Sequence, residues 1–190
     1  MEILLTALAT FTYEVQKHAA TLSLIQKYAS QYRLDGTPSP FMEICEQAVE
    51  QQLLSLLSKV FDKEETCGKI NCSFRTLQKE GREKNLSQAT ICAIDDLYAD
   101  YEQIISRDVR NKKLAHIDWE MLYNSKLATV DYSDLLQFIK KTCATINAIS
   151  KEALFADIVM PNISEIEKAI ESEFPFNQLT FKTCYEFKRN

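Results

Sequence analysis

One short stretch, residues 107–119, holds the residue types that phosphate chemistry requires. It reads R-D-V-R-N-K-K-L-A-H-I-D-W and contains one of the two histidines of the chain. The guanidinium of Arg110 can hold a phosphate with a planar fork of donors, and His116 can move a proton near neutral pH. Asn111 could donate to the phosphate or orient His116, and Asp118 could hydrogen-bond His116 or cap the following turn. The stretch is therefore the first candidate for a site that acts on a phosphate ester.

The same stretch is locally basic, although the chain as a whole is acidic. The whole sequence carries a net charge of −5, whereas residues 107–116 contain four basic residues and one acidic residue, a local net charge of +3. A broad electrostatic surface for duplex nucleic acid is not expected at that overall charge. Contact with RNA would be local, and three further cations are predicted to hold its phosphates: Arg107, Lys112 and Lys113.

A structural interpretation of the basic cluster is also open. Apolar residues recur at helical spacing from about Ser87 onward, and no Gly or Pro intervenes before Ala115. The cluster would then be the C-terminal end of one long helix. Cations are favourable there because they face the negative end of the helix dipole.

The spacing of the pair raises a geometric question. On an ideal helix, six residues separate Arg110 from His116 by about 120° in azimuth and about 9 Å along the axis. Either the helix ends or distorts before His116, or the site is composite across a dimer. The dimer suits cleavage of RNA by its own 2′-hydroxyl, since that reaction needs a base and an acid and one histidine cannot be both at once. Two copies of His116 could share these roles while two copies of Arg110 stabilise the charge on the phosphate.

The elements that must position this stretch are helices. With only 3 Gly and 4 Pro in 190 residues, turn signals are few, and the prediction is an all-α protein. We expect an antiparallel bundle of four to five main helices with short appended C-terminal elements. Residues 1–158 would form the bundle, with a long N-terminal helix in 1–33 and a core in 41–155. Residues 159–190 would add a short helix and an aromatic-rich tail. The predicted helices span 2–32, 41–61, 74–80 (ended by Gly81), about 87–115, 135–155 and 162–173.

The first helix carries a heptad-like apolar seam, and His18 lies on it. Such seams are the buried face of a bundle helix, although a long edge helix could also pair with a second copy of itself. His18 is predicted to be structural. The seam residues are Leu4, Leu8, Phe11, Val15, His18, Leu22, Ile25 and Ala29.

No metal site or cofactor is predicted. The six cysteines are scattered, and Cys67 and Cys72 lack a second pair with zinc-ligand spacing. No secretory signal is expected, since Glu2 stands where a basic region should precede the apolar start. No apolar run approaches the ~18 residues of a membrane span. We therefore expect a cytoplasmic protein that does not contact a membrane and keeps its thiols reduced.

The run from Arg110 to His116, with five residues between them and Asp118 two residues beyond, resembles the signature of HEPN domains. The wider form R-N-K-K-L-A-H-I-D is most similar to the AbiU-type HEPN-like proteins of bacterial abortive infection. The stretches F-M-E-I-C-E-Q-A-V and L-S-K-V-F-D also resemble that family. The resemblance covers roughly residues 41–155.

The resemblance implies a helical bundle that forms a homodimer and often acts as a metal-independent endoribonuclease. Arg110 and His116 would be the catalytic pair and Asn111 the polar residue beside the arginine. The substrate would be single-stranded RNA, and the role phage defence or that of a toxin neutralised by an antitoxin. Other members have lost activity and serve as nucleotide- or protein-binding modules. A tyrosine that partners modify in one subgroup is Asp118 here, so that modification is not expected. Three alternatives remain: a nuclease, a non-catalytic module, and a bundle whose basic cluster only decorates a helix end.

Overall fold

The computed structural model describes residues 1–29, 33–34, 37–105, 130–153 and 158–173. This part of the chain contains six α-helices and two small antiparallel β-ribbons. The helices are α1 (Glu2–Ala29), α2 (Pro40–Val60), α3 (Phe74–Glu83), α4 (Gln88–Ile104), α7 (Tyr132–Glu152) and α8 (Ile163–Glu173). The ribbons pair β1 (Arg33–Leu34) with β2 (Thr37–Pro38), and β3 (Glu65–Thr66) with β4 (Lys69–Ile70).

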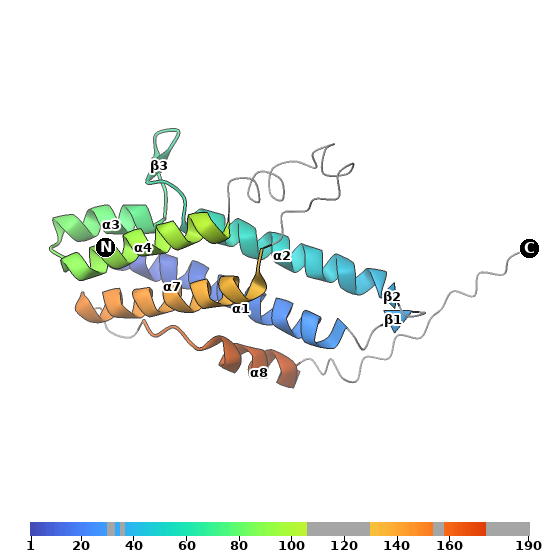
Figure 1. The fold of residues 1–190 in the computed structure, drawn as a ribbon. Helices are drawn as coiled ribbons and strands as arrows, with labels where there is room; N and C mark the ends of the chain where they lie inside the picture. Colours follow the sequence, from blue (N-terminus) through green and yellow to red (C-terminus); the bar gives the residue numbers. More distant parts are fainter. Residues whose placement is uncertain (30–32, 35–36, 106–129, 154–157, 174–190) are drawn as a thin grey trace, which may run out of the picture.

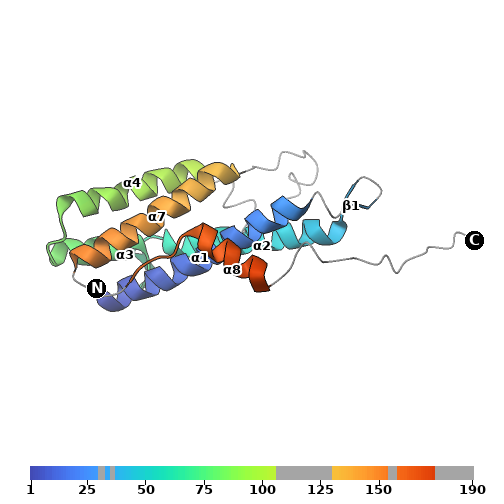
Figure 2. The same cartoon turned by 90° about the horizontal axis from the view of Figure 1, so that it is seen from below.

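The four long helices run up and down beside one another (Figures 1 and 2). Helix α1 packs against α2, α3, α7 and α8, and α4 packs against α3 and α7. The β3–β4 ribbon projects from the side of the bundle, and the β1–β2 ribbon joins α1 to α2 at one end (Figure 1). The predicted all-α antiparallel bundle is therefore confirmed.

Helix α1 is a core helix, not an edge helix. Leu8, Val15 and Leu22 of the predicted seam are at most 3% exposed, and Leu5 and Leu24 on other sides of the helix are buried as well. These seam residues pack within the chain, as the buried face of a bundle helix does. His18 is half-buried, and its Nδ1 lies 2.8 Å from the carbonyl oxygen of Glu14, as a structural role requires.

The helix starts follow the capping residues in the sequence. Ser73 and Ser87 each accept a hydrogen bond from the backbone N–H three residues on. Asp131 accepts two such bonds at the start of α7. Asn162 donates its backbone N–H to the Glu165 carboxylate, and its own side chain accepts from Ser164 N–H. These bonds satisfy donors that a helix start leaves without partners.

The prediction that Gly81 ends α3 is wrong, because the helix continues to Glu83. The residue that ends it is Asn85, whose φ of 59° lies in the left-handed region. Leu86 N–H then donates to the Gly81 carbonyl at 2.9 Å, and Asn85 N–H donates to that of Arg82. This is the Schellman arrangement of a helix end. A Cβ at position 81 would lie 2.5 Å from Leu86 Cδ1, so a larger residue there would require the Leu86 side chain to move.

The prediction of one unbroken helix from about 87 to 115 is also wrong. Helix α4 ends at Ile104. Ile105, with φ −112° and ψ 74°, is no longer in a helical conformation. Two β-branched residues in succession hold a helix end weakly, and the Ile105 side chain is buried in the core. Packing thus ends the helix where no Gly or Pro marks the sequence. The last turn of α4 contains no basic residue.

Aromatic rings join four helices in the core. Phe61, just after α2, stacks on Phe74 of α3 at 5.3 Å between centroids and on Tyr101 of α4 at 4.9 Å. It also meets the edge of Tyr98 and lies 5.0 Å from Phe138 of α7. Such ring pairs add to the burial energy and fix where the ends of α2 and α4 stand relative to each other.

Candidate functional site

The candidate site residues lie outside the described residues. All of them fall in segment 106–129: Arg107, Arg110, Asn111, Lys112, Lys113, His116 and Asp118. What the structure describes is the frame to which this segment is attached, namely the end of α4, the start of α7 and the surfaces beside them. The aromatic-rich tail, 174–190, lies outside the described residues as well.

Both ends of segment 106–129 are attached at the same end of the bundle. Helices α4 and α7 are antiparallel neighbours, so the C-terminus of one lies beside the N-terminus of the other (Figures 1 and 2). An ion pair between Lys141 Nζ and Asp100 Oδ2, 2.6 Å apart, bridges the two helices. The chain therefore leaves and re-enters the bundle at neighbouring points.

A groove of ≈ 960 Å³ lies beside the end of α4. Its walls come from the C-terminal part of α2, the loop that follows it, the start of α3, and α4 from Tyr98 to its end. We call it the α2–α4 groove. Ile105 also lines it, and Ser106 is the first residue of the segment that holds the candidate catalytic pair. The groove thus adjoins the start of that segment.

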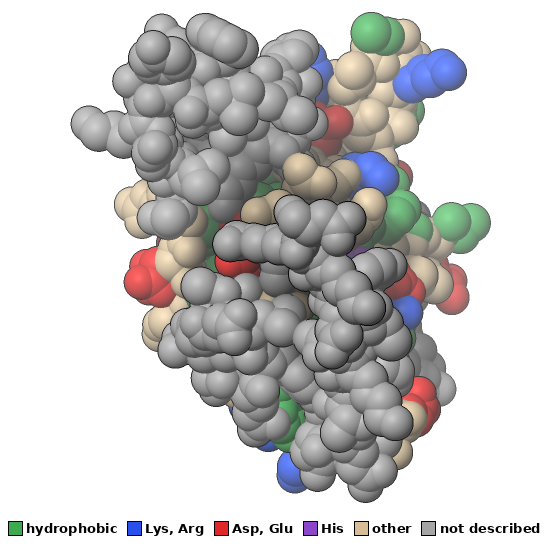
Figure 3. Space-filling model, turned by 90° about the vertical axis from the view of Figure 1, so that its right-hand side faces the viewer, with side chains coloured by type: hydrophobic (Ala, Val, Ile, Leu, Met, Phe, Trp, Pro, Cys, Tyr) green, Lys and Arg blue, Asp and Glu red, His purple; other side chains and the backbone are tan. Residues whose placement is uncertain are grey.

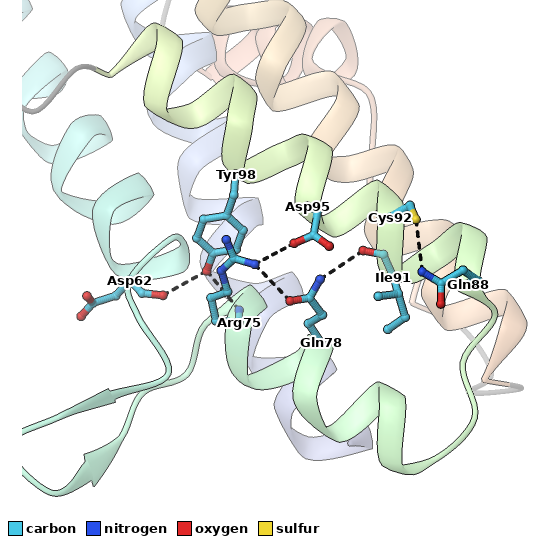
Figure 4. A network of polar contacts seen from close by, with 8 residues as sticks. All are labelled: Asp62, Arg75, Gln78, Gln88, Ile91, Cys92, Asp95 and Tyr98. Carbon is cyan, nitrogen blue, oxygen red and sulfur yellow. Dashed lines mark hydrogen bonds and ion pairs between the residues drawn. The ribbon is translucent and has the colours of Figure 1, made fainter.

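One wall of the groove is a network of polar contacts (Figure 4). The guanidinium of Arg75 lies over the ring of Tyr98, 4.0 Å from its centroid, and its Nη1 is 2.7 Å from Asp95 Oδ1. The backbone N–H of Arg75 donates to the Tyr98 hydroxyl, which in turn donates to the carbonyl of Asp62 at 3.0 Å. Gln78 accepts from the same Arg75 nitrogen. These bonds tie α3, α4 and the loop after α2 into one rigid wall.

The network keeps fixed protonation states near neutral pH. Burial raises the pKa of Tyr98 to about 12, so its phenol remains a donor. Hydrogen bonds from Gln78 and from Arg75 hold the pKa of the Asp95 carboxyl below its ordinary value, so it stays charged. The wall is therefore suited to positioning and not to moving protons.

The groove also presents exposed charge. Lys59 and Lys63 are exposed and line it, together with Glu102. The Asp62 carboxylate accepts from Lys63 N–H at 2.8 Å and from the Asn71 amide, two residues that flank the β3–β4 ribbon. Figure 4 shows this carboxylate pointing away from Tyr98. Two lysines that make no ion pair within the described residues therefore line the cavity, together with two exposed acidic residues, of which only Asp62 has its carboxylate engaged in these hydrogen bonds.

A second cavity of ≈ 640 Å³ lies between α4 and α7. Three aspartates line it: Asp100, Asp131 and Asp134. Asp100 is paired with Lys141, and Asp131 caps α7. This excess of carboxylates disfavours an anion, so of these two cavities the α2–α4 groove is the one that suits phosphate.

Charge elsewhere is mixed. On the face shown in Figure 3, the described Lys, Arg, Asp and Glu side chains are interspersed, without a broad basic patch among them. Within the described ranges, no three His, Cys, Asp or Glu side chains are grouped closely enough to hold a metal ion. None of the described helices is both long and apolar enough to cross a membrane.

Lys59, Lys63 and Arg75 line the groove but are not among the site residues predicted from the sequence. A signal was present, since Lys59 and Lys63 stand four residues apart on either side of Phe61, where the apolar pattern of α2 stops. Their spacing alone does not reveal which cavity they line, because the loop direction after Phe61 depends on the aromatic cluster and on the β3–β4 ribbon.

The comparison with protein families gives one match. The profile described as AbiU2, of the HEPN class, matches residues 5–172. This range runs through all six described helices and extends on both sides of residues 41–155. No curated protein and no solved structure matches the chain.

Proposed function

The chain belongs to the AbiU2 family of HEPN proteins, and on that premise we propose that it is a metal-independent endoribonuclease that cleaves single-stranded RNA. The observation that carries the proposal is the stretch R-N-K-K-L-A-H, from Arg110 to His116, in a chain whose family match includes it. Arg110 and His116 are the proposed catalytic pair.

The proposed reaction is attack of the RNA 2′-hydroxyl on the adjacent phosphodiester. One His116 takes the 2′-hydroxyl proton, and a second, protonated His116 gives a proton to the leaving 5′-oxygen. Arg110 stabilises the charge that develops on the phosphate, and Asn111 supports it with a neutral donor. Two histidines in opposite protonation states require two copies of the chain, so the proposed active form is a homodimer.

Two features of the described bundle support this proposal. The two ends of segment 106–129 attach at the same end of the bundle, beside a groove lined by Lys59 and Lys63, which make no ion pair within the described residues. Helix α4 ends at Ile104, before Arg110, so the candidate pair is not part of this helix. The case for a dimer rests on proton chemistry and on the family.

A cleavage assay tests the proposal. A fluorescently labelled single-stranded RNA is incubated in EDTA with the wild type, His116→Ala, Arg110→Ala and His18→Ala. We expect cleavage by the wild type and a loss of about 10²–10⁴-fold in rate for His116→Ala, since that is the usual value of general acid–base catalysis. His18→Ala is the matched control, because it removes the other histidine of the chain, which bonds within α1.

Two results would contradict the nuclease. Cleavage that survives His116→Ala would remove this mechanism. No cleavage by the wild type, together with binding of RNA or of a protein partner, would identify a non-catalytic module, the alternative that the net charge of −5 favours. A role in phage defence, with a neutralising antitoxin, remains part of the proposal and needs a test in cells.

A further inference from the structure

We infer that the α2–α4 groove is a phosphate subsite for single-stranded RNA, in which Lys59 and Lys63 bind backbone phosphates of nucleotides that flank the cleaved bond. This inference rests on the proposed function for the identity of the ligand. It adds residues from α2 and the loop after it to a site that the sequence placed only in residues 107–118.

The covalent chain keeps the groove and the catalytic pair close. Ile105 lines the groove, and Arg110 follows five residues later. A chain of five residues spans at most about 18 Å. An RNA strand whose cleaved phosphate lies at Arg110 can therefore reach the groove within a few nucleotides.

The two lysines are available for a phosphate. Four lysines of the described helices are paired with carboxylates, namely Lys17, Lys27, Lys79 and Lys141. Lys59 and Lys63 make no ion pair within the described residues. Both are exposed and line the same cavity. Unpaired ammonium groups that converge on a groove bind phosphate as point charges.

The walls supply a neutral donor and engage the Asp62 carboxylate in hydrogen bonds. Ser58 Oγ accepts the Tyr101 hydroxyl hydrogen at 3.1 Å, so it retains its own hydrogen to donate. Asp62 is next to Lys63 in sequence, but its carboxylate accepts from Lys63 N–H and from the Asn71 amide. Arg75 is held through Nη1 by Asp95 and Gln78 and stiffens the wall.

Glu102 opposes the binding of an anion. It is exposed, lines the groove and makes no hydrogen bond or ion pair within the described ranges. Its removal should therefore strengthen RNA binding, whereas removal of the lysines should weaken it. Changes of opposite sign within one cavity separate a subsite from a general effect on folding or solubility.

The test measures RNA affinity as salt is varied. Anisotropy of a labelled single-stranded RNA is followed in a His116→Ala background, so that the RNA is not cleaved. We compare the added changes Lys59→Ala/Lys63→Ala, Glu102→Gln, and the control Lys140→Ala/Lys151→Ala. The control removes two exposed lysines from α7 and so produces the same change in net charge.

We expect the groove double variant to bind about tenfold more weakly near 0.1 M salt. The slope of log affinity against log salt should fall by about 1.4, because each lost contact to a single strand removes about 0.7. The control should keep the original slope, and Glu102→Gln should bind more tightly than its parent. An unchanged slope in the groove variant, or no RNA binding by its parent, would overturn the inference.

Failure of the subsite is distinguishable from failure of the nuclease. Cleavage by the wild type with an unchanged salt slope in the groove variant would reject the groove and keep the nuclease. A reduced slope without cleavage by the wild type would keep the groove and reject the nuclease.

Discussion

Thr12 and Thr142 are buried helical threonines, each 1% exposed, that differ in one respect. The Thr142 hydroxyl donates to the Phe138 carbonyl at 2.9 Å. The Thr12 hydroxyl and the nearby Gln16 Oε1 find no hydrogen-bond partner among the described residues, although Gln16 Nε2 donates to the Pro161 carbonyl. A buried hydroxyl without a partner lowers stability, because burial removes its hydrogen bonds to water and no hydrogen bond within the protein replaces them.

Replacing each threonine by valine should therefore have opposite effects. Thr12→Val should raise the free energy of unfolding by about 1 kcal/mol, and Thr142→Val should lower it by about 1 kcal/mol. Urea denaturation of the two variants and the wild type measures both changes in the free energy of unfolding. Each variant is the control for the other, because both replace an equally buried threonine with a valine of nearly the same shape. Equal destabilisation by both would show that the Thr12 hydroxyl has a partner.

The N-terminus of α4 is held by a side chain from α7, and this contact links two elements. The Glu152 carboxylate accepts from the Ser87 backbone N–H and from the hydroxyls of Ser87 and Thr90. A carboxylate at the positive end of a helix dipole is favourable. The Thr90 hydroxyl, followed by the Ser87 N–H, holds the pKa of Glu152 below its ordinary value of 4.5.

This contact should give α4 a pH-dependent anchor. Since the folded-state pKa is depressed, the contribution is present above pH 4.5 and is lost as the pH falls through the folded-state pKa. Glu152→Gln should lower the free energy of unfolding at pH 7, and the difference from the wild type should shrink well below pH 4.5. Urea denaturation at both pH values measures this, with the exposed Glu173→Gln as control. A difference that stays constant with pH would contradict the anchor.

The packing of α4 against α7 also explains why segment 106–129 attaches to the bundle at two neighbouring points. Helix α4 is fixed at its start by Glu152 and near its end by the Asp100–Lys141 ion pair. Both contacts are to α7, so the two helices stay in register along their length. Whatever segment 106–129 binds, its attachment points are set by this pair.

At the scale of the whole molecule, the proposed active form is a dimer with one histidine from each chain. Mixing then gives a quantitative prediction. Wild-type chains are unfolded together with an equal amount of His116→Ala chains and refolded, so that they exchange. If both histidines are needed, only about a quarter of the dimers are fully active, and activity falls to about a quarter of that of the same total amount of wild type.

A site complete in one chain predicts a different result, namely about half of the wild-type activity in the same mixture. Refolding of each protein alone supplies the control for losses on refolding. Sedimentation of the wild type measures its oligomeric state. A monomer that cleaves RNA would contradict the composite site.

The sequence by itself determined the helical class, the order of the helices and most of their starts. Few Gly and Pro, apolar positions at helical spacing, and capping residues such as Ser87 and Asp131 act over a few neighbouring residues, so a linear pattern contains them. The same holds for the run from Arg110 to His116, which indicated the family. Its geometry lies outside the described residues and stays a prediction.

Only the tertiary structure decided where helices stop and which surfaces meet. Helix α3 continues past Gly81 and ends only where Asn85 turns left-handed and Leu86 N–H bonds back to Gly81, and α4 ends at Ile104 because Ile105 turns into the core. Likewise, α1 is central instead of peripheral because it packs against four other helices. The α2–α4 groove joins Lys59, in the last turn of α2, and Lys63, just after α2, to the end of α4, more than 40 residues away. Contacts over such separations depend on how all the helices pack together, and no local spacing in the sequence encodes them.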